Sequence, residues 1–549
     1  MEKTDDITHS NNNHDQHEGT ERKLEGRHLT MIAIGGTIGT GLFLNSGALM
    51  STVGALGLLL AYFISGTAVF FVVCSLGEMA TLIPISGSFN SYASRFVDPA
   101  LGFTSGWNYF FSWVIVKLQA AASFLNRWLP NVNQYALMGI LLAVLVLVNC
   151  FAVDGFGEVE YWLSIVKILA IVFFIVAGFI ALGKGIGGTF MYNLTMEQGQ
   201  KLNPPLNLTA DAGGPFLGAP AGLALKNIIG IIKVSFILTL KILVAMIGAC
   251  FSFGGTEIVG ITAGEAKNPR KAVPRAINGT FWRIMIFYII SVFLIGLLLP
   301  ATFDKFQSED KISKSPFVFA LSAAKIPGVE DFMNAICLVA VISTANSSIY
   351  ASARSLMALA QEDRAPAIFA KTSKNGVPYL SVALTVLIGC IAFSGSLFGD
   401  GVVFNWLINV SGSTIIVTWW MINLTHLRFR KAYKAQGYRL QDLPYRALFF
   451  PYGCYFGLFF TGAVVILNPI LGAIDDDGTF SLKSFLGSFI TLPVYLIIFI
   501  GWKLVKKTKV VPLMDVDLDT GNINIHAKEM GIFEEKPKTG FAKMINFLA

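Results

Sequence analysis

The feature that most constrains this chain is a series of about twelve apolar runs, each long enough to cross the roughly 30 Å hydrocarbon core of a bilayer as a helix. Hydrophobic residues make up 54% of the 549 residues and charged residues only 14%. A soluble protein of this size has a larger fraction of charged residues and does not need so many apolar residues for its core. We therefore predict an all-α integral membrane protein with about twelve transmembrane helices. The expected helices cover residues 29–50, 54–80, 103–128, 135–153, 162–182, 240–262, 284–302, 332–358, 380–398, 402–424, 452–471 and 485–504.

Lysine and arginine concentrate in the connections expected on one side of the membrane. The connections 265–277, 361–376 and 426–441 are basic, whereas the connection that contains Asp475–Asp477 is acidic. Because basic loops stay on the cytoplasmic side, we predict that both termini are cytoplasmic. The connection 154–162 contradicts this pattern, since it should lie inside and carries only acidic charges.

Two of the apolar runs are interrupted by glycines near their middle. The first reads GGTIGTG (35–41) and the second reads FSFGGTE (251–257). Each glycine costs a helix about 1 kcal/mol relative to alanine, so the interruptions need a reason. Close helix packing is one reason, because Gly35 and Gly39 have GxxxG spacing. Glu257 favours a functional reason, because a carboxylate within a bilayer segment is costly.

These interrupted runs are the first and the sixth, so they occupy equivalent positions if the first ten helices form two repeats of five. Paired interruptions of this kind indicate a transporter binding site. A broken helix exposes N–H groups that bind a carboxylate and C=O groups that bind an ammonium, and an amino acid carries both. We predict a 5+5 inverted-repeat core with broken helices 1 and 6 over 29–424. It is preceded by a cytoplasmic tail (1–28) and followed by helices 11 and 12 (425–505) and a second cytoplasmic tail (506–549).

Several motifs resemble those of fungal amino-acid permeases of the amino acid–polyamine–organocation superfamily. The C-terminal EKPKTGFAKMINFLA is most similar to the basic amino-acid branch, which transports arginine or lysine. The resemblance implies proton-coupled uptake across the plasma membrane through a ten-helix inverted-repeat core with two further helices. The matching motifs span nearly the whole chain after the N-terminal tail, at 35–47, 77–113, 155–171, 251–277, 342–382 and 404–412.

The resemblance also implies a substrate site. Backbone around Thr40 would contact the substrate carboxylate, and backbone around Phe253 would contact the amine. Phe251 would cap the pocket as a gating aromatic, with ordinary packing as the alternative. Ser411 lies where the basic branch helps to select side chains. The predicted substrate-binding residues are Thr37, Gly39, Thr40, Gly41, Phe251, Ser252, Phe253, Gly254, Gly255, Glu257 and Ser411.

Lys167 is a lone lysine in the fifth apolar run. Related transporters carry a lysine here whose protonation replaces a sodium ion, so the resemblance assigns Lys167 to proton coupling. Burial would favour the neutral amine and allow proton exchange near physiological pH. The alternative is a lysine that extends to the cytoplasmic surface along its aliphatic stem.

The chain also departs from the family pattern. Where these permeases commonly have Glu before Leu in the third helix, this chain carries Lys117. In the cavity, Lys117 would repel a cationic substrate side chain; alternatively it points away or pairs with Glu257. Asn346 and Ser347 are either pocket residues or polar contacts between helices. The segment 224–248, rich in isoleucine and lysine, is a second departure and could form an interfacial helix before its span.

We expect no enzyme activity, cofactor, metal or nucleic acid, because the spans lack catalytic motifs and the six cysteines lack CxxC spacing. The proton gradient would supply the energy. The expected partners are an amino-acid substrate, protons and the lipid bilayer, with ubiquitin and endocytic adaptors on tail lysines such as Lys3 and Lys23. Alternatives to a basic amino-acid permease are a broader or neutral amino-acid permease and a non-transporting amino-acid receptor of the same fold.

Overall fold

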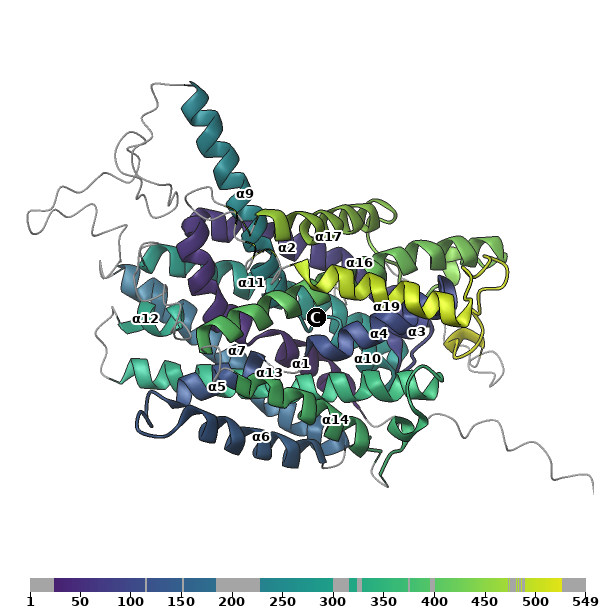
Figure 1. Ribbon diagram of the computed structural model, residues 1–549, viewed down its shortest axis with the longest axis horizontal. Coiled ribbons are helices and arrows are strands. Elements are labelled where there is room, and N and C mark those ends of the chain that lie inside the picture. The colour runs from purple at the N-terminus through teal and green to yellow at the C-terminus, as the bar shows by residue number, and fades with distance from the viewer. Residues whose placement is uncertain are drawn as a thin grey trace, which may run out of the picture.

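The computed structural model describes residues 24–113, 116–150, 153–183, 228–299, 315–322, 328–373, 376–394, 400–471 and 489–525, with single positions at 473, 480, 482 and 485. These ranges form a bundle of long helices that run in roughly one direction or its opposite (Figure 1). The predictions made for residues 1–23, for Asp475–Asp477 and for residues 526–549 lie outside the described residues.

Figure 1 labels the helices in chain order. They are α1 (Gly26–Thr37), the π-helix η1 (Gly41–Asn45), α2 (Ser46–Leu82), α3 (Ser88–Phe96), α4 (Pro99–Ser112), α5 (Val116–Leu125), α6 (Gln134–Cys150), α7 (Val153–Gly183), α9 (Ile228–Phe253), α10 (Ile258–Thr262), the 3₁₀ turn η2 (Ala263–Glu265), α11 (Pro269–Leu298), α12 (Pro316–Ser322), α13 (Val329–Gln361), η4 (Ala367–Ala370), α14 (Tyr379–Gly389), η5 (Cys390–Ser394), α16 (Asp400–Ala435), η6 (Leu440–Asp442), α17 (Tyr452–Leu471) and α19 (Thr491–Lys506).

Six helical stretches within the described ranges are long and apolar enough to cross a bilayer. The first of them, Gly26–Leu82, holds two spans, because Gly54 adopts φ 71° and ψ 175° and kinks the chain between them. Three shorter apolar helices, Gln134–Cys150, Met285–Leu298 and Tyr379–Ser394, add further spans. With α4 and α5 as one span and α19 as the last, the bundle agrees with about twelve transmembrane helices, so the predicted all-α fold class is confirmed.

Several predicted connections prove to be helical. Residues 154–162 belong to α7, most of 265–277 belongs to α11, and α16 continues through 426–441 as far as Ala435. An apolar run marks only the part of a helix that faces lipid or core, whereas charged residues continue the same hydrogen-bonded helix beyond it. In contrast, α17 begins and ends at the predicted residues 452 and 471.

The segment 224–248 does not form a separate interfacial helix over the part that is described. Residues from Ile228 continue without interruption to Phe253 as the single helix α9. In Figure 1 the first part of this helix, drawn in teal, extends beyond the rest of the bundle.

The two broken helices run in opposite directions. The backbone N–H of Leu24, just before α1, donates to the carbonyl of Glu265 at 2.9 Å, and the N–H of Lys267 donates to the carbonyl of Leu24 at 2.9 Å. The start of the first broken helix therefore lies beside the end of the sixth. Two repeats of opposite orientation produce this arrangement. The paired segments lie at the predicted cytoplasmic end of the bundle.

Below the breaks, this predicted cytoplasmic end is closed by buried polar contacts. The Arg354 guanidinium on α13 donates to the Glu265 carboxylate at 2.7 Å, and the Tyr350 hydroxyl donates to the same carboxylate. The Tyr350 ring stacks on Phe156 of α7 with centroids 4.1 Å apart. These contacts tie the sixth helix to the fifth and eighth helices.

The C-terminal residues after α19 lie along the same end of the bundle. The N–H of Val511 donates to the carbonyl of Val97 at 2.9 Å, and the Gln436 side chain donates to the carbonyl of Val516 at 2.7 Å. Leu518 is buried. This part of the predicted tail is therefore packed against the helices.

Both helix breaks are built on glycine. α1 ends at Thr37 because Ile38 is extended (φ −74°, ψ 104°), and α9 ends at Phe253 before a turn. Gly255 in that turn has φ +107°, and a methyl group on it would lie 2.5 Å from the carbonyl oxygen of Gly36. The glycines therefore both interrupt the helices and let the two breaks touch, so the packing and the helix-breaking interpretations apply together.

We predict that Gly255→Ala destabilises the protein by about 1–3 kcal/mol, because the new methyl group meets the Gly36 carbonyl and the backbone is held at positive φ. The measurement is the thermal unfolding midpoint of the purified protein in detergent. Gly279→Ala is the matched control, because its methyl group would meet nothing within 4 Å. Equal midpoints for the two variants would contradict the backbone contact.

Candidate functional site

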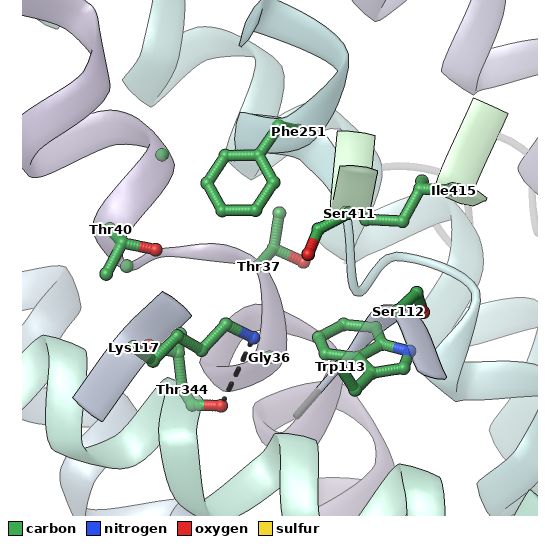
Figure 2. Close-up of a pocket in the computed structure, with 13 residues that line it drawn as sticks. Gly36, Thr37, Thr40, Ser112, Trp113, Lys117, Phe251, Thr344, Ser411 and Ile415 are labelled. Atoms are coloured by element: carbon green, nitrogen blue, oxygen red, sulfur yellow. Dashed lines mark hydrogen bonds between the residues drawn. The ribbon is translucent and has the colours of Figure 1, made fainter. Parts of the chain in front are cut away.

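A cavity lies where the two helix breaks meet. Helix ends that stop inside a membrane bundle leave backbone groups that no intrahelical partner satisfies, so such breaks occur where protein or a cavity surrounds them. Figure 2 shows the cavity with Phe251 on one side and Lys117 and Trp113 on the other. It is lined by Gly36, Thr37, Gly39, Thr40, Gly41, Ser112, Trp113, Lys117, Phe251, Gly254, Thr344, Ser411 and Ile415.

Most of the predicted substrate-binding residues line this cavity. They come from the break in the first helix, from the break in the sixth and from α16. The residues that do so are Thr37, Gly39, Thr40, Gly41, Phe251, Gly254 and Ser411. The others, Ser252, Phe253, Gly255 and Glu257, stand behind the cavity wall and contact neighbouring helices.

Tyr288 of α11 joins the carbonyl ends of the two breaks. Its hydroxyl lies 3.0 Å from the carbonyl oxygen of Thr37 and 2.8 Å from that of Ser252, and donates toward both. The Phe253 ring stacks on the Tyr288 ring with centroids 4.8 Å apart. The Ser252 hydroxyl donates to the Gly248 carbonyl at 3.0 Å. Ser252 and Phe253 therefore position the break from behind.

Glu257 is held by three donors at the start of α10. The N–H of Gly255 and the hydroxyl of Tyr109 lie 3.2 Å and 3.3 Å from one carboxylate oxygen, and the indole N–H of Trp419 lies 3.1 Å from the other. The side chain is fully buried. Glu257 therefore links the sixth helix to α4 and α16 and does not line the cavity.

Lys117 of α5 points into the cavity (Figure 2). Its ammonium donates to the carbonyl of Thr344 at 3.4 Å and to the hydroxyl of Ser348, and it lies 4.1 Å from the centroid of the Trp113 ring. The alternatives that Lys117 points away or pairs with Glu257 do not describe this geometry. The Lys117 amine therefore faces whatever occupies the cavity.

Lys117 and Trp113 also border a second cavity. Apart from Lys117, Ser348 and Thr385, its walls are mainly apolar side chains of α5, α6, α13 and α14. The two cavities share Trp113 and Lys117, so these two side chains form the wall between them.

Lys167 of α7 is fully buried, which overturns the alternative of a lysine that extends to the surface. α7 begins at Val153 rather than near 162, so Lys167 lies several turns inside the helix. Its ammonium donates to the carbonyl of Gly35 in α1 and lies 3.8 Å from the carboxylate of Glu160. Lys167 therefore reaches the first broken helix just before its break.

Asn346 stands beside this pair and does not line the cavity. Its amide nitrogen lies 3.4 Å from the Glu160 carboxylate, and its amide oxygen accepts from Asn149 at 2.7 Å. Both contacts join the eighth helix to its neighbours.

Several residues of the site were not predicted from the sequence. Ser112, Trp113 and Thr344 fall inside family-like motifs that were not assigned residue by residue. Glu160 was placed in a connection, although its i, i+7 spacing to Lys167 would have put both side chains on one face of a longer helix. For Tyr288 we find no signal in the sequence.

An inverted-repeat membrane bundle with two broken helices around a central polar cavity is the architecture of a secondary transporter. The model of the amino acid permease family matches residues 28–513, and the chain belongs to that family. The resemblance noted in the sequence is thereby confirmed.

Relatives from bacteria and yeast support the same membership. The lysine-specific permease LysP of Lactococcus lactis is 39% identical over 91% of this chain and 92% of its own length. The general amino-acid permease GAP2 of Candida albicans is 36% identical over 94% and 84%, and the basic amino-acid permease of Saccharomyces cerevisiae is 34% identical over 96% and 88%. A manganese transporter of Eremococcus coleocola shares the fold, with a TM-score of 0.51 and 12% identity over 90% of this chain and 98% of that one.

We predict that Glu257→Ala lowers the thermal unfolding midpoint, because the variant leaves the Tyr109 hydroxyl and the Trp419 indole N–H buried without an acceptor. Each buried donor without an acceptor costs about 1–3 kcal/mol. The exposed Glu330→Ala on α13 is the control and should change the midpoint little. An unchanged midpoint for Glu257→Ala, together with lost substrate binding, would instead place this carboxylate in contact with the substrate.

Proposed function

We propose that this permease is a secondary active transporter that imports amino acids across the plasma membrane by proton-coupled alternating access. The observation that carries the proposal is the cavity at the two helix breaks, where helix N-termini and C-termini meet. The N–H groups around Gly39, Thr40 and Gly41 would bind the substrate carboxylate, and the carbonyls at the end of α9 would bind the amine.

Basic amino acids are the first candidate substrates. Two supports favour them: the C-terminal sequence is similar to that of the basic branch, and the relatives include permeases named for lysine and for basic amino acids. Ser411 lines the cavity and would contact the substrate side chain.

Neutral amino acids, or a broader range of amino acids, are the second candidate substrates, and one observation favours them. The Lys117 ammonium lies in the cavity wall, and its described partners are the neutral oxygens of Thr344 and Ser348. A cationic side chain close to the protonated form of Lys117 would be repelled, and the repulsion is stronger in a protein cavity than in water.

Proton coupling is assigned to Lys167. A lysine that donates to the α1 backbone next to the break can link its own protonation to the position of that helix. The proposed topology places both termini in the cytoplasm, where lysines such as Lys3 and Lys23 would be available to ubiquitin and endocytic adaptors. A non-transporting receptor of the same fold would bind amino acids without uptake.

We predict saturable uptake of labelled amino acids when the protein is expressed in a permease-deficient cell, falling as the external pH rises because the proton gradient falls. Unlabelled lysine, arginine, leucine and glutamine, each added in excess, would rank the substrate classes. Competition by lysine and arginine supports the first candidate, and competition by the neutral amino acids alone supports the second. No uptake, with intact surface expression, would favour the receptor.

We predict that Lys167→Ala removes the pH dependence of uptake while the protein still reaches the surface, because the group that exchanges the proton is gone. The measurement is initial uptake rate across external pH, with surface biotinylation for expression. A pH profile like that of the wild type would refute the role of Lys167 in coupling.

We predict that Lys117→Met improves competition by lysine and arginine relative to leucine by about tenfold or more, because a charge repulsion of about 1.4 kcal/mol corresponds to a factor of ten. Methionine keeps an unbranched side chain of similar length without the charge. An unchanged ranking of competitors would show that Lys117 does not select the substrate.

A further inference from the structure

A second polar cluster lies on α7, beside the cavity. Glu160 and Lys167 are two turns apart on one face of the helix, and both side chains are completely buried. The ammonium nitrogen and the nearest carboxylate oxygen are 3.8 Å apart. A buried pair of this kind depends on both partners, because removing one charge leaves the other without compensation.

The pair touches α1 at the last turn before its break. Lys167 donates to the carbonyl of Gly35, and Ser164 donates to the carbonyl of Met31 at 2.8 Å. A methyl group on Gly35 would lie 2.2 Å from the Glu160 carboxylate oxygen, so α1 sits directly on the pair. The inner half of the first broken helix is therefore held to α7 at this point.

Glu160 is fixed from the opposite side by α13. The hydroxyl of Ser343 donates to one carboxylate oxygen, and the amide of Asn346 lies 3.4 Å from the other. Asn149 of α6 in turn donates to Asn346 at 2.7 Å. The carboxylate is thus anchored to the scaffold, whereas the second partner of Lys167 is a backbone carbonyl of a helix that ends inside the bundle.

The titratable groups nearest the pair form contacts with partners other than Glu160 and Lys167, and of these groups Lys117 is close enough to interact electrostatically with both members of the pair. The elements that contact α7 are α1, α11, α12 and α13, and α12 (PFVFALS) carries no titratable residue. On α1, Arg27 and His28 contact Glu158, and on α11 the Tyr288 hydroxyl contacts the Thr37 and Ser252 carbonyls. On α13, Cys337 contacts Ser315, and Tyr350 and Arg354 contact Glu265. On the adjacent α5, Lys117 contacts Thr344 and Ser348.

We propose, on the basis of the proposed proton-coupled transport, that Glu160 is a positioning residue for Lys167. The carboxylate holds the ammonium on the Gly35 carbonyl, and the charged pair keeps α1 closed against α7. When Lys167 releases its proton to water on the cytoplasmic side, the attraction to Glu160 is lost and the amine has one N–H fewer to donate. The inner half of α1 is then free to move away from α7.

The first test measures the position of α1 without any transport. Ala33 of α1 is buried, so Ala33→Cys, with the exposed Cys150 and Cys390 replaced by serine, reports its exposure to a water-soluble maleimide. We predict that Glu160→Gln speeds labelling by about fivefold or more, the factor expected for a loss of about 1 kcal/mol. In a Lys167→Ala background Glu160→Gln should add little, because both changes remove one interaction.

Glu158→Gln is the matched control. Glu158 lies on the same helix and also contacts α1, through Arg27 and His28, but its side chain is 45% exposed. Exposed ion pairs contribute little to stability, so the labelling rate of the Glu158→Gln protein should stay near that of the parent protein. Equal labelling rates in the Glu160→Gln and Glu158→Gln proteins would overturn the inference.

The second test is the pH profile of the apparent KM for uptake. We predict that Glu160→Gln moves the pH midpoint of this profile about one unit or more toward acid, because Lys167 then keeps its proton less readily without the carboxylate. Glu160→Asp keeps the charge at a longer distance and should give intermediate labelling and an intermediate midpoint. If the Glu160→Gln protein does not fold, the Glu160→Asp protein is used in its place for both measurements.

The two proposals fail separately. Absence of uptake by the wild-type protein would overturn the proposed transport but not the labelling difference. An unchanged midpoint and unchanged labelling in Glu160→Gln, with normal uptake, would overturn the role of Glu160 alone.

Discussion

Inside a bilayer, a backbone N–H or C=O that leaves its helix has no water to bond, and the centre of this protein is arranged around that constraint. The carbonyls that α1 and α9 leave at their ends lie close enough to share one hydroxyl, that of Tyr288. In the turn that follows, the N–H of Gly255 is bonded to Glu257, which Tyr109 and Trp419 hold in place. The buried Glu257 carboxylate thus satisfies a backbone N–H group that the break in the sixth helix exposes. The cavity lies between the broken ends of the first and sixth helices.

α13 connects the cavity with the charged pair on α7. Thr344 packs against Gly39 and accepts from Lys117, while Ser343 and Asn346 bond to Glu160. The residues that face the cavity and those that hold the pair are neighbours on a single helix. A short path along α13 therefore joins the place where a substrate would bind to the place where a proton would be exchanged.

The architecture could be predicted from the sequence because its signals are local. The apolar run 452–471 has the same bounds as α17, and the glycines of 35–41 and 251–257 mark both breaks. Other features depend on contacts between distant segments. The direction of Lys117 is set by where α13 places Thr344, and no spacing rule encodes that contact.

Charged residues account for the main differences between the predicted and the observed helices. Glu158 and Glu160 made residues 154–162 resemble a connection, yet one carboxylate faces the surface and the other is buried against Lys167. A hydropathy scale gives both residues the same value, because it takes no account of the oppositely charged partner that offsets the cost of burying Glu160. A helix whose buried charge is compensated two turns further along is therefore cut short in a prediction based on apolar runs.

The pairing of Leu24 with Glu265 and Lys267 alters the meaning of the N-terminal segment. Residues 24–28 were expected to belong to a free tail, but Leu24 is buried and bonded to the end of the sixth helix. Separation of the start of α1 from the residues that end the sixth helix has to break these two backbone hydrogen bonds. The start of α1 and the end of the sixth helix therefore either move together or separate only after both bonds are lost.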